Sequence, residues 1–153
     1  MPPIIEEPLE ARQALEFPYK HSTGPVIGRF LAGLKEQGLI WGRRTKGLGV
    51  VVPPLGYSEL DGSDDEGIWV QVADRGVVTA FAKVHQPLEG LHPCTTPFAF
   101  VLVKLEGADT PMAHIVTDGL DRLKVGSRVI AHWKPAEERI GSIKDIAAFR
   151  LAE

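Results

Sequence analysis

From residue 68 onward, the chain alternates short runs of β-branched and aromatic residues with clusters of turn-forming residues, and this pattern most limits the possible folds. The β-rich segments are Ile68–Val72, Val77–His85, Phe98–Leu105, Met112–Thr117 and Val125–Trp133, with a last short run at Ile143–Leu151. The longest connection runs from Pro87 to Pro97. About five strands are too few for an immunoglobulin-like sandwich. We therefore predict a mainly β fold, a five-stranded OB-type Greek-key barrel.

Other elements precede this barrel. Residues 1–24 are rich in proline and are interpreted as an arm. Between Pro25 and Gln37, apolar residues recur at spacings of three and four and Gly38 follows, which predicts an amphipathic helix. Residues 39–54 predict a hairpin, and residues 56–67 a polar, acidic loop. The predicted organisation is an arm and helix over 1–38, a hairpin and acidic loop over 39–67, and a barrel over 68–153, all in one compact unit.

Composition and charge exclude several classes of protein. The 153 residues are 44% hydrophobic and 24% charged, which is typical of one globular domain. A formal net charge of −3 argues against binding nucleic acid mainly through its phosphates. The single cysteine, Cys94, cannot form an internal disulfide. Since no apolar run approaches the length of a membrane span and no secretory signal is recognisable, we expect a cytoplasmic protein.

The predicted helix is followed by Gly38-Leu39-Ile40-Trp41-Gly42-Arg43-Arg44, by a hairpin ending at Pro53-Pro54, and by Gly76-Val77-Val78-Thr79 in a strand that ends at His85. This order, over most of residues 24–151, resembles the acyl-CoA-associated OB-fold family. Members usually place a rubredoxin-like zinc ribbon before the barrel, with two Cys-x2-Cys pairs flanking a Pro-Pro turn. Aligned on that turn, the four ligand positions fall at Thr45, Leu48, Ser58 and Asp61. None is a cysteine, so we expect a degenerate ribbon-like hairpin without zinc.

Two strings, residues 46–54 and 97–110, are similar to a metal-free branch of this family. The resemblance implies a subunit that binds and activates a thiolase-fold aldolase, or a thiolase, in a hetero-oligomer that can include a MaoC-type hydratase. The implied reaction is retro-aldol cleavage of a steroid side-chain coenzyme A thioester, with the catalytic residues mostly on the partner. We accordingly expect no catalytic residue and no cofactor in this chain, the coenzyme A thioester being the substrate of the complex.

Without zinc, the hairpin must be stabilised by packing. Its apolar run Leu48 to Val52, with Leu55, Tyr57 and Leu60, predicts contact either with the amphipathic helix or with another subunit, and the sequence leaves both open. Cations beside an aromatic ring suit coenzyme A phosphates or an acidic partner face, and an aromatic residue near a rigid turn suits an interface. The candidate partner- or coenzyme A-binding residues are Trp41, Arg43, Arg44, Lys46, Pro53, Pro54 and Tyr57.

Two other functions compete with the subunit hypothesis. Cys94, with His92 and His85 nearby in sequence, could serve a small hydrolase or lyase, although no acid and no oxyanion motif accompanies them. The same two histidines and His114 are candidate metal ligands, but their direction depends on an unknown strand register. A single-stranded nucleic-acid module would need aromatic side chains along one face of the barrel. Trp69, Phe81, Phe98 and Phe100 alternate with apolar neighbours and are predicted to be core residues.

Overall fold

The C-terminal part of the chain forms a closed five-stranded barrel with the order β4-β5-β6-β8-β7. The computed structural model describes residues 16–57 and 67–152. The barrel strands are β4 (Arg75–Val84), β5 (Phe98–Leu105), β6 (Met112–Val116), β7 (Arg128–Trp133) and β8 (Ile146–Leu151). β6 and β8 form a parallel pair, whereas the other neighbours pair antiparallel, and β7 returns to β4 to close the barrel. This confirms the predicted OB-type architecture.

A second, three-stranded antiparallel sheet precedes the barrel, with the order β2-β1-β3. Its strands are β1 (Ile40–Thr45), β2 (Gly49–Val51) and β3 (Ile68–Val72). The prediction of a hairpin over residues 39–54 is confirmed. The placement of Ile68–Val72 among the barrel strands is wrong, because β3 pairs with β1, from Ile40 opposite Val72 to Arg44 opposite Ile68. The fifth barrel strand is instead the last short run of the sequence.

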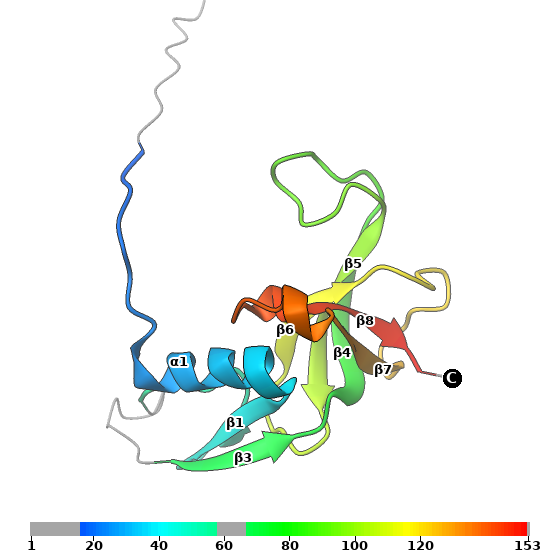
Figure 1. The fold of residues 1–153 in the computed structure, drawn as a ribbon. Coiled ribbons are helices and arrows are strands. Elements are labelled where there is room, and N and C mark those ends of the chain that lie inside the picture. Colours follow the sequence, from blue (N-terminus) through cyan, green and yellow to red (C-terminus); the bar gives the residue numbers. More distant parts are fainter. Residues whose placement is uncertain (1–15, 58–66, 153) are drawn as a thin grey trace, which may run out of the picture.

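Helix α1 (Gly24–Ala32) continues into a π-helical segment, η1 (Gly33–Gln37), that ends at a left-handed Gly38. The predicted helix is confirmed over the same span. Pro25 lies in the first turn, where its missing N–H leaves no helical hydrogen bond unmade. Gly33 is required by packing, since a Cβ there would collide with the Trp41 ring. Figure 1 shows α1 lying along the three-stranded sheet, with the barrel to one side.

The hairpin and the barrel are joined by reciprocal hydrogen bonds. The loop after β5 brings Asp109 to β2, where its carboxylate accepts from the Val50 N–H at 2.7 Å and its own N–H donates to the Val50 carbonyl at 2.8 Å. Thr110 is bonded in both directions to Val52. Its hydroxyl accepts from the Val52 N–H at 2.9 Å and donates to the Val52 carbonyl at 3.4 Å. These bonds complete one edge of the small sheet. They connect the two strings that resemble the metal-free branch.

One hydrophobic core runs through helix, sheet and barrel. Phe30, Leu34, Val50 and Val52 belong to the same buried cluster as the barrel residue Phe149. Of the two alternatives for the zinc-free hairpin, packing within the chain is therefore the one observed for Val50 and Val52; Leu60 lies outside the described residues. Two short 3-10 helices, η2 (Ala136–Glu138) and η3 (Ile143–Asp145), connect β7 to β8. Within residues 16–57 and 67–152, no helix is long and apolar enough to span a bilayer.

Candidate functional site

The predicted partner-binding residues begin with Trp41 on β1, which is half-buried. The Arg29 guanidinium of α1 lies 5.5 Å from the centre of the Trp41 ring and 4.5 Å from that of Trp69 on β3. Such distances are typical of cation–π contacts. Trp41 thus contacts Arg29 of α1, a further cation beside it that sequence reasoning did not select.

The three predicted cations do not form one surface cluster. Arg43 is only 7% exposed, and its guanidinium donates to the carbonyl of Leu55 at 2.9 Å and to that of Gly67 at 3.4 Å. It therefore ties β1 to the segments on either side of the acidic loop. Arg44 and Lys46 are exposed. Arg43 and Arg44 differ because neighbouring side chains of a strand point to opposite faces, whereas Lys46 lies in the turn after β1.

At the end of the hairpin, Pro53 is exposed and Pro54 is buried. Tyr57 is 53% exposed, as expected for a residue able to anchor a partner. The exposed members of the predicted set are therefore Arg44, Lys46, Pro53 and Tyr57.

The zinc-ribbon positions are only partly described. Thr45 is buried on β1 and its hydroxyl has no hydrogen-bond partner among the described residues, while Leu48 is half-buried in the turn. Ser58 and Asp61 lie outside the described residues, as does most of the acidic loop. In the two described ranges, no three His, Cys, Asp or Glu side chains are grouped so that they could hold a metal ion.

His85, His92 and Cys94, the residues considered for a hydrolase or lyase, differ in environment. The His92 ring packs edge-on against Phe98 with centroids 5.7 Å apart, and its Nδ1 accepts from the Leu88 N–H at 2.8 Å, so it stabilises the β4–β5 loop. His85 is exposed. No hydrogen bond joins Cys94 to a histidine in the part of the chain that the structure describes. The structure thus brings together no nucleophile–base pair around Cys94.

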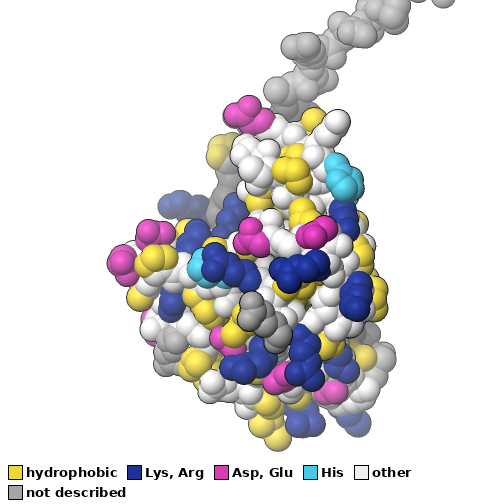
Figure 2. All heavy atoms as spheres, turned by 90° about the vertical axis from the view of Figure 1, so that its right-hand side faces the viewer, with side chains coloured by type: hydrophobic (Ala, Val, Ile, Leu, Met, Phe, Trp, Pro, Cys, Tyr) yellow, Lys and Arg dark blue, Asp and Glu magenta, His cyan; other side chains and the backbone are white. Residues whose placement is uncertain are grey.

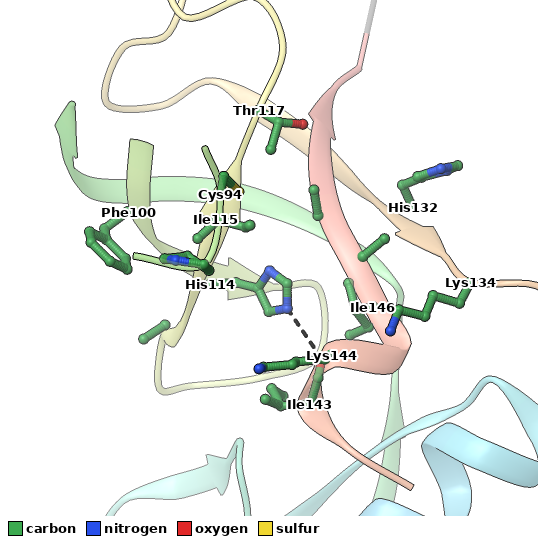
Figure 3. Close-up of a pocket in the computed structure, with 14 residues that line it drawn as sticks. Cys94, Phe100, His114, Ile115, Thr117, His132, Lys134, Ile143, Lys144 and Ile146 are labelled. Carbon is green, nitrogen blue, oxygen red and sulfur yellow. Dashed lines mark hydrogen bonds between the residues drawn. The ribbon is translucent and has the colours of Figure 1, made fainter. Parts of the chain in front are cut away.

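A groove of about 590 Å³ crosses the outside of the barrel. Its wall is formed by β5, β6, β7 and β8, by η3, and by Pro93 and Cys94 of the β4–β5 loop (Figure 3). Phe100, predicted to be a core residue, is 45% exposed and lines this groove, so that prediction is wrong. Strand alternation places Phe98 and Phe100 on the same outer face of β5, where Phe98 is buried against His92 of the β4–β5 loop and Phe100 remains exposed. OB folds commonly bind ligands on the face of their second and third barrel strands, which here are β5 and β6. The flanking loops are the β4–β5 loop and the β7–β8 connection.

His114 lies in the groove wall on β6. Its Nε2 lies 3.3 Å from the Ile143 carbonyl, and its ring packs edge-on against Phe149 at 5.4 Å. Burial lowers the pKa of His114, and the carbonyl contacts offset this only in part. Because a carbonyl can only accept, Nε2 carries the proton of the neutral ring. The buried Nδ1 has no hydrogen-bond partner among the described residues.

Next to the groove, the β7–β8 connection is held by a fully buried carboxylate, Asp145. Its oxygens accept from the N–H groups of Ile140 at 3.0 Å, Gly141 at 2.8 Å and Ser142 at 3.1 Å. Burial alone raises the pKa of Asp145, but these three hydrogen bonds and the charge of Lys134 together hold the pKa below its ordinary value. The carboxylate thereby fixes the backbone that carries Ile143 and Lys144.

Sequence reasoning missed the groove. Its two cations, Lys134 and Lys144, belong to the β7–β8 connection and meet residues of β5 and β6 that lie far from them in the chain. No local motif marks them. Figure 2 shows Lys and Arg side chains on the face of β7 and β8 intermixed with acidic and apolar ones, without a stripe of a single charge. On this face, the basic groove that nucleic-acid binding requires is missing.

Residues 69–134 match the family model described as the C-terminal OB-fold domain of ChsH2. No curated protein sequence matches the chain. Among solved structures, one titled "Ltp2-ChsH2(DUF35) aldolase" is similar with a TM-score of 0.55 and 23% identity, over 74% of this chain and 87% of the other. A DUF35-family protein of unknown function from Sulfolobus solfataricus has a TM-score of 0.55 and 22% identity, over 71% and 78% of the two chains. These structural likenesses confirm the fold. Residues 69–134 therefore match the ChsH2 C-terminal OB-fold family, and this match supports the resemblance to the acyl-CoA-associated OB-fold proteins.

Proposed function

We propose that this chain is a non-catalytic subunit that binds a thiolase-fold aldolase and is required for its activity. The observation that carries the proposal is the match of residues 69–134 to the ChsH2 C-terminal domain, together with a similar solved structure whose title names an Ltp2-ChsH2 aldolase. The chain assembles no nucleophile, base and oxyanion donor among its described residues. An accessory role is consistent with that arrangement.

The proposed reaction of the complex is retro-aldol cleavage of a coenzyme A thioester with a steroid side chain. In such a step the bond between Cα and the hydroxyl-bearing Cβ breaks, the hydroxyl becomes a carbonyl, and a shorter acyl-CoA leaves. This chain contributes surface and not acid–base chemistry. The exposed residues of the hairpin, Arg44, Lys46, Pro53 and Tyr57, are the proposed contacts with the aldolase or with the coenzyme A phosphates. A MaoC-type hydratase remains a prediction from the resemblance alone.

The test is co-expression with a thiolase-like aldolase. We expect the two to co-purify, and we expect cleavage of a β-hydroxyacyl-CoA carrying a steroid ring system only when both are present. The measurement follows the ketone and the shorter CoA thioester by chromatography. Cleavage by the thiolase-like protein alone at the same rate, or no association between the two, contradicts the proposal.

A matched pair of variants locates the contact. Arg44→Glu reverses an exposed charge on β1, and Lys124→Glu makes the same reversal in the turn before β7, on the barrel. We expect Arg44→Glu, and separately Tyr57→Ala, to weaken association with the aldolase at least tenfold by removing interface anchors, and Lys124→Glu to leave it unchanged. Equal effects of the two charge reversals would place the interface elsewhere. Salt-sensitive binding of a fluorescent single-stranded oligonucleotide would favour the nucleic-acid alternative.

A further inference from the structure

The groove on the barrel has the properties of a small-molecule site. Its volume of about 590 Å³ lies within the usual range for such sites. Its wall is mostly apolar, formed by Phe100 of β5, Ile115 of β6, Ile146 of β8 and alanines between them. Phe100 leaves 45% of its surface uncovered, a large apolar side chain exposed where it can contact a ligand. The apolar wall indicates a ligand with an apolar body.

The charge in the groove lies at one end. Lys134, at the end of β7, and Lys144, in η3, line it, and no acidic side chain of the described residues does. Figure 3 shows Lys144 extending beneath the His114 ring and Lys134 extending toward Ile146, whereas His132 points away. Neither lysine forms an ion pair within 4 Å in the described residues. The Asp145 carboxylate, which is influenced by the charge of Lys134, is fully buried and bonded to three backbone N–H groups.

The position of the two lysines is fixed by the fold. The three hydrogen bonds to Asp145 hold the turn that carries Lys144, and the Lys134 N–H donates to the Asp145 carbonyl at 2.9 Å. Both cations are therefore attached to one rigid connection at the end of an apolar wall. A preorganised site of this kind loses little entropy when a ligand binds.

We propose that this groove binds an apolar monocarboxylate, with its hydrocarbon body along Phe100, Ile115 and Ile146 and its carboxylate at Lys134 and Lys144. The proposal goes beyond the aldolase-subunit function and does not rest on it, because every residue involved belongs to this chain. It also assigns a role to Phe100 of β5 and Ile115 of β6, the apolar residues that line the groove on these two strands. The ligand carboxylate would supply the negatively charged partner that Lys134 and Lys144 lack among the described residues.

The test uses decanoate and 1-decanol, which share a ten-carbon chain and differ in charge. Cys94 lines the groove and is the single cysteine of the chain, so the rate of its alkylation by N-ethylmaleimide reports occupancy. We expect decanoate to slow alkylation and to bind, by calorimetry on the full chain, about fivefold more tightly than 1-decanol. Octanoate should bind roughly fifteenfold more weakly than decanoate, since each buried methylene contributes about fourfold.

Variants separate the two parts of the site. Lys144→Glu should reduce decanoate affinity about tenfold and leave 1-decanol binding unchanged, whereas the control Lys124→Glu should change neither. Ala113→Trp fills the groove from an exposed position and should abolish binding of both probes. Lys144→Gln serves if the charge reversal unfolds the chain, as judged by circular dichroism. Binding that survives Ala113→Trp, or equal affinities for decanoate and decanol, would overturn the proposal.

Discussion

The barrel and the three-stranded sheet satisfy their backbone hydrogen bonds in different ways. In the barrel, every strand has two neighbouring strands, because β7 pairs with β4 and closes the circle. In the small sheet, β1 is the one strand of the described residues that pairs with β2, whose other edge is completed by Asp109 and Thr110 from the barrel loop. An unpaired edge is a liability that proteins cover. The sheet therefore depends on the barrel, while the barrel is closed without the sheet.

This dependence also explains how the hairpin manages without cysteine ligands. In a zinc ribbon, metal coordination holds the two arms of the turn. Here apolar burial of Val50 and Val52 and the reciprocal bonds to Asp109 and Thr110 hold the second arm. The hairpin is therefore stabilised by hydrogen bonds to a loop distant in sequence, where a zinc ribbon uses local metal coordination.

Gly49→Ala tests the comparison most severely. Gly49 has φ +77°, and a Cβ there would collide with the Asp109 carboxylate. Backbone strain and loss of the Val50–Asp109 bonds together should lower the free energy of unfolding by about 3 kcal/mol in urea titrations. Hydrogen exchange should accelerate in residues 40–51 more than in β4–β8.

The matched control for this substitution is Gly126→Ala. Its φ is +86°, but no atom lies within 4 Å of the added Cβ, so only backbone strain of about 1 kcal/mol is expected. Equal losses in the two variants, or uniform acceleration of exchange over the whole chain, would show that the sheet does not depend on the contact with Asp109.

Asp145→Asn probes the barrel side of the comparison and has a pH signature. The amide cannot accept from three N–H groups as the carboxylate does, so we expect a loss of about 2 kcal/mol at pH 7. Since the folded pKa is lowered, this stabilisation is present above the unfolded value near 3.9 and is lost as pH falls through the folded pKa. The difference between wild type and variant should shrink below about pH 4.

Urea titrations of both proteins from pH 7 to pH 3 measure this effect. Asp118→Asn is the control, because Asp118 is 71% exposed and lies 3.9 Å from Arg150, so its removal should change stability by less than about 0.5 kcal/mol. A stability difference that stays constant with pH would mean that the charge on Asp145 contributes nothing.

Asp109→Ala gives the smallest expected loss, about 1–2 kcal/mol, by leaving the Val50 N–H without its acceptor. Asp109→Asn keeps an acceptor oxygen and should lose less than half as much. Calorimetric melting of the two variants measures the difference, and faster exchange of the Val50 amide locates it. If alanine and asparagine are equivalent, the side-chain bond does not hold the edge of β2.

Much of the fold follows from local pattern. The helix over residues 25–37 follows from apolar spacing, Pro25 and Gly38, and the hairpin from a turn between two extended runs. Strand pairing did not follow in the same way. Ile68–Val72 has the alternation of any half-buried strand, and alternation does not indicate which neighbour supplies the hydrogen bonds. The assignment of β3 to the barrel was wrong for that reason.

The same limit holds for the candidate sites: local features could be predicted from the sequence, but side-chain neighbours could not. Sequence by itself determined that the ribbon positions hold no cysteine, that a tyrosine follows the Pro-Pro turn, and that about five strands build the barrel. Only the tertiary structure decided that Arg43 turns inward to Leu55 and Gly67, and that Lys134 and Lys144 meet Phe100 in one groove. The physical reason is that composition and periodicity are local properties, whereas a barrel wall joins side chains from strands distant in sequence.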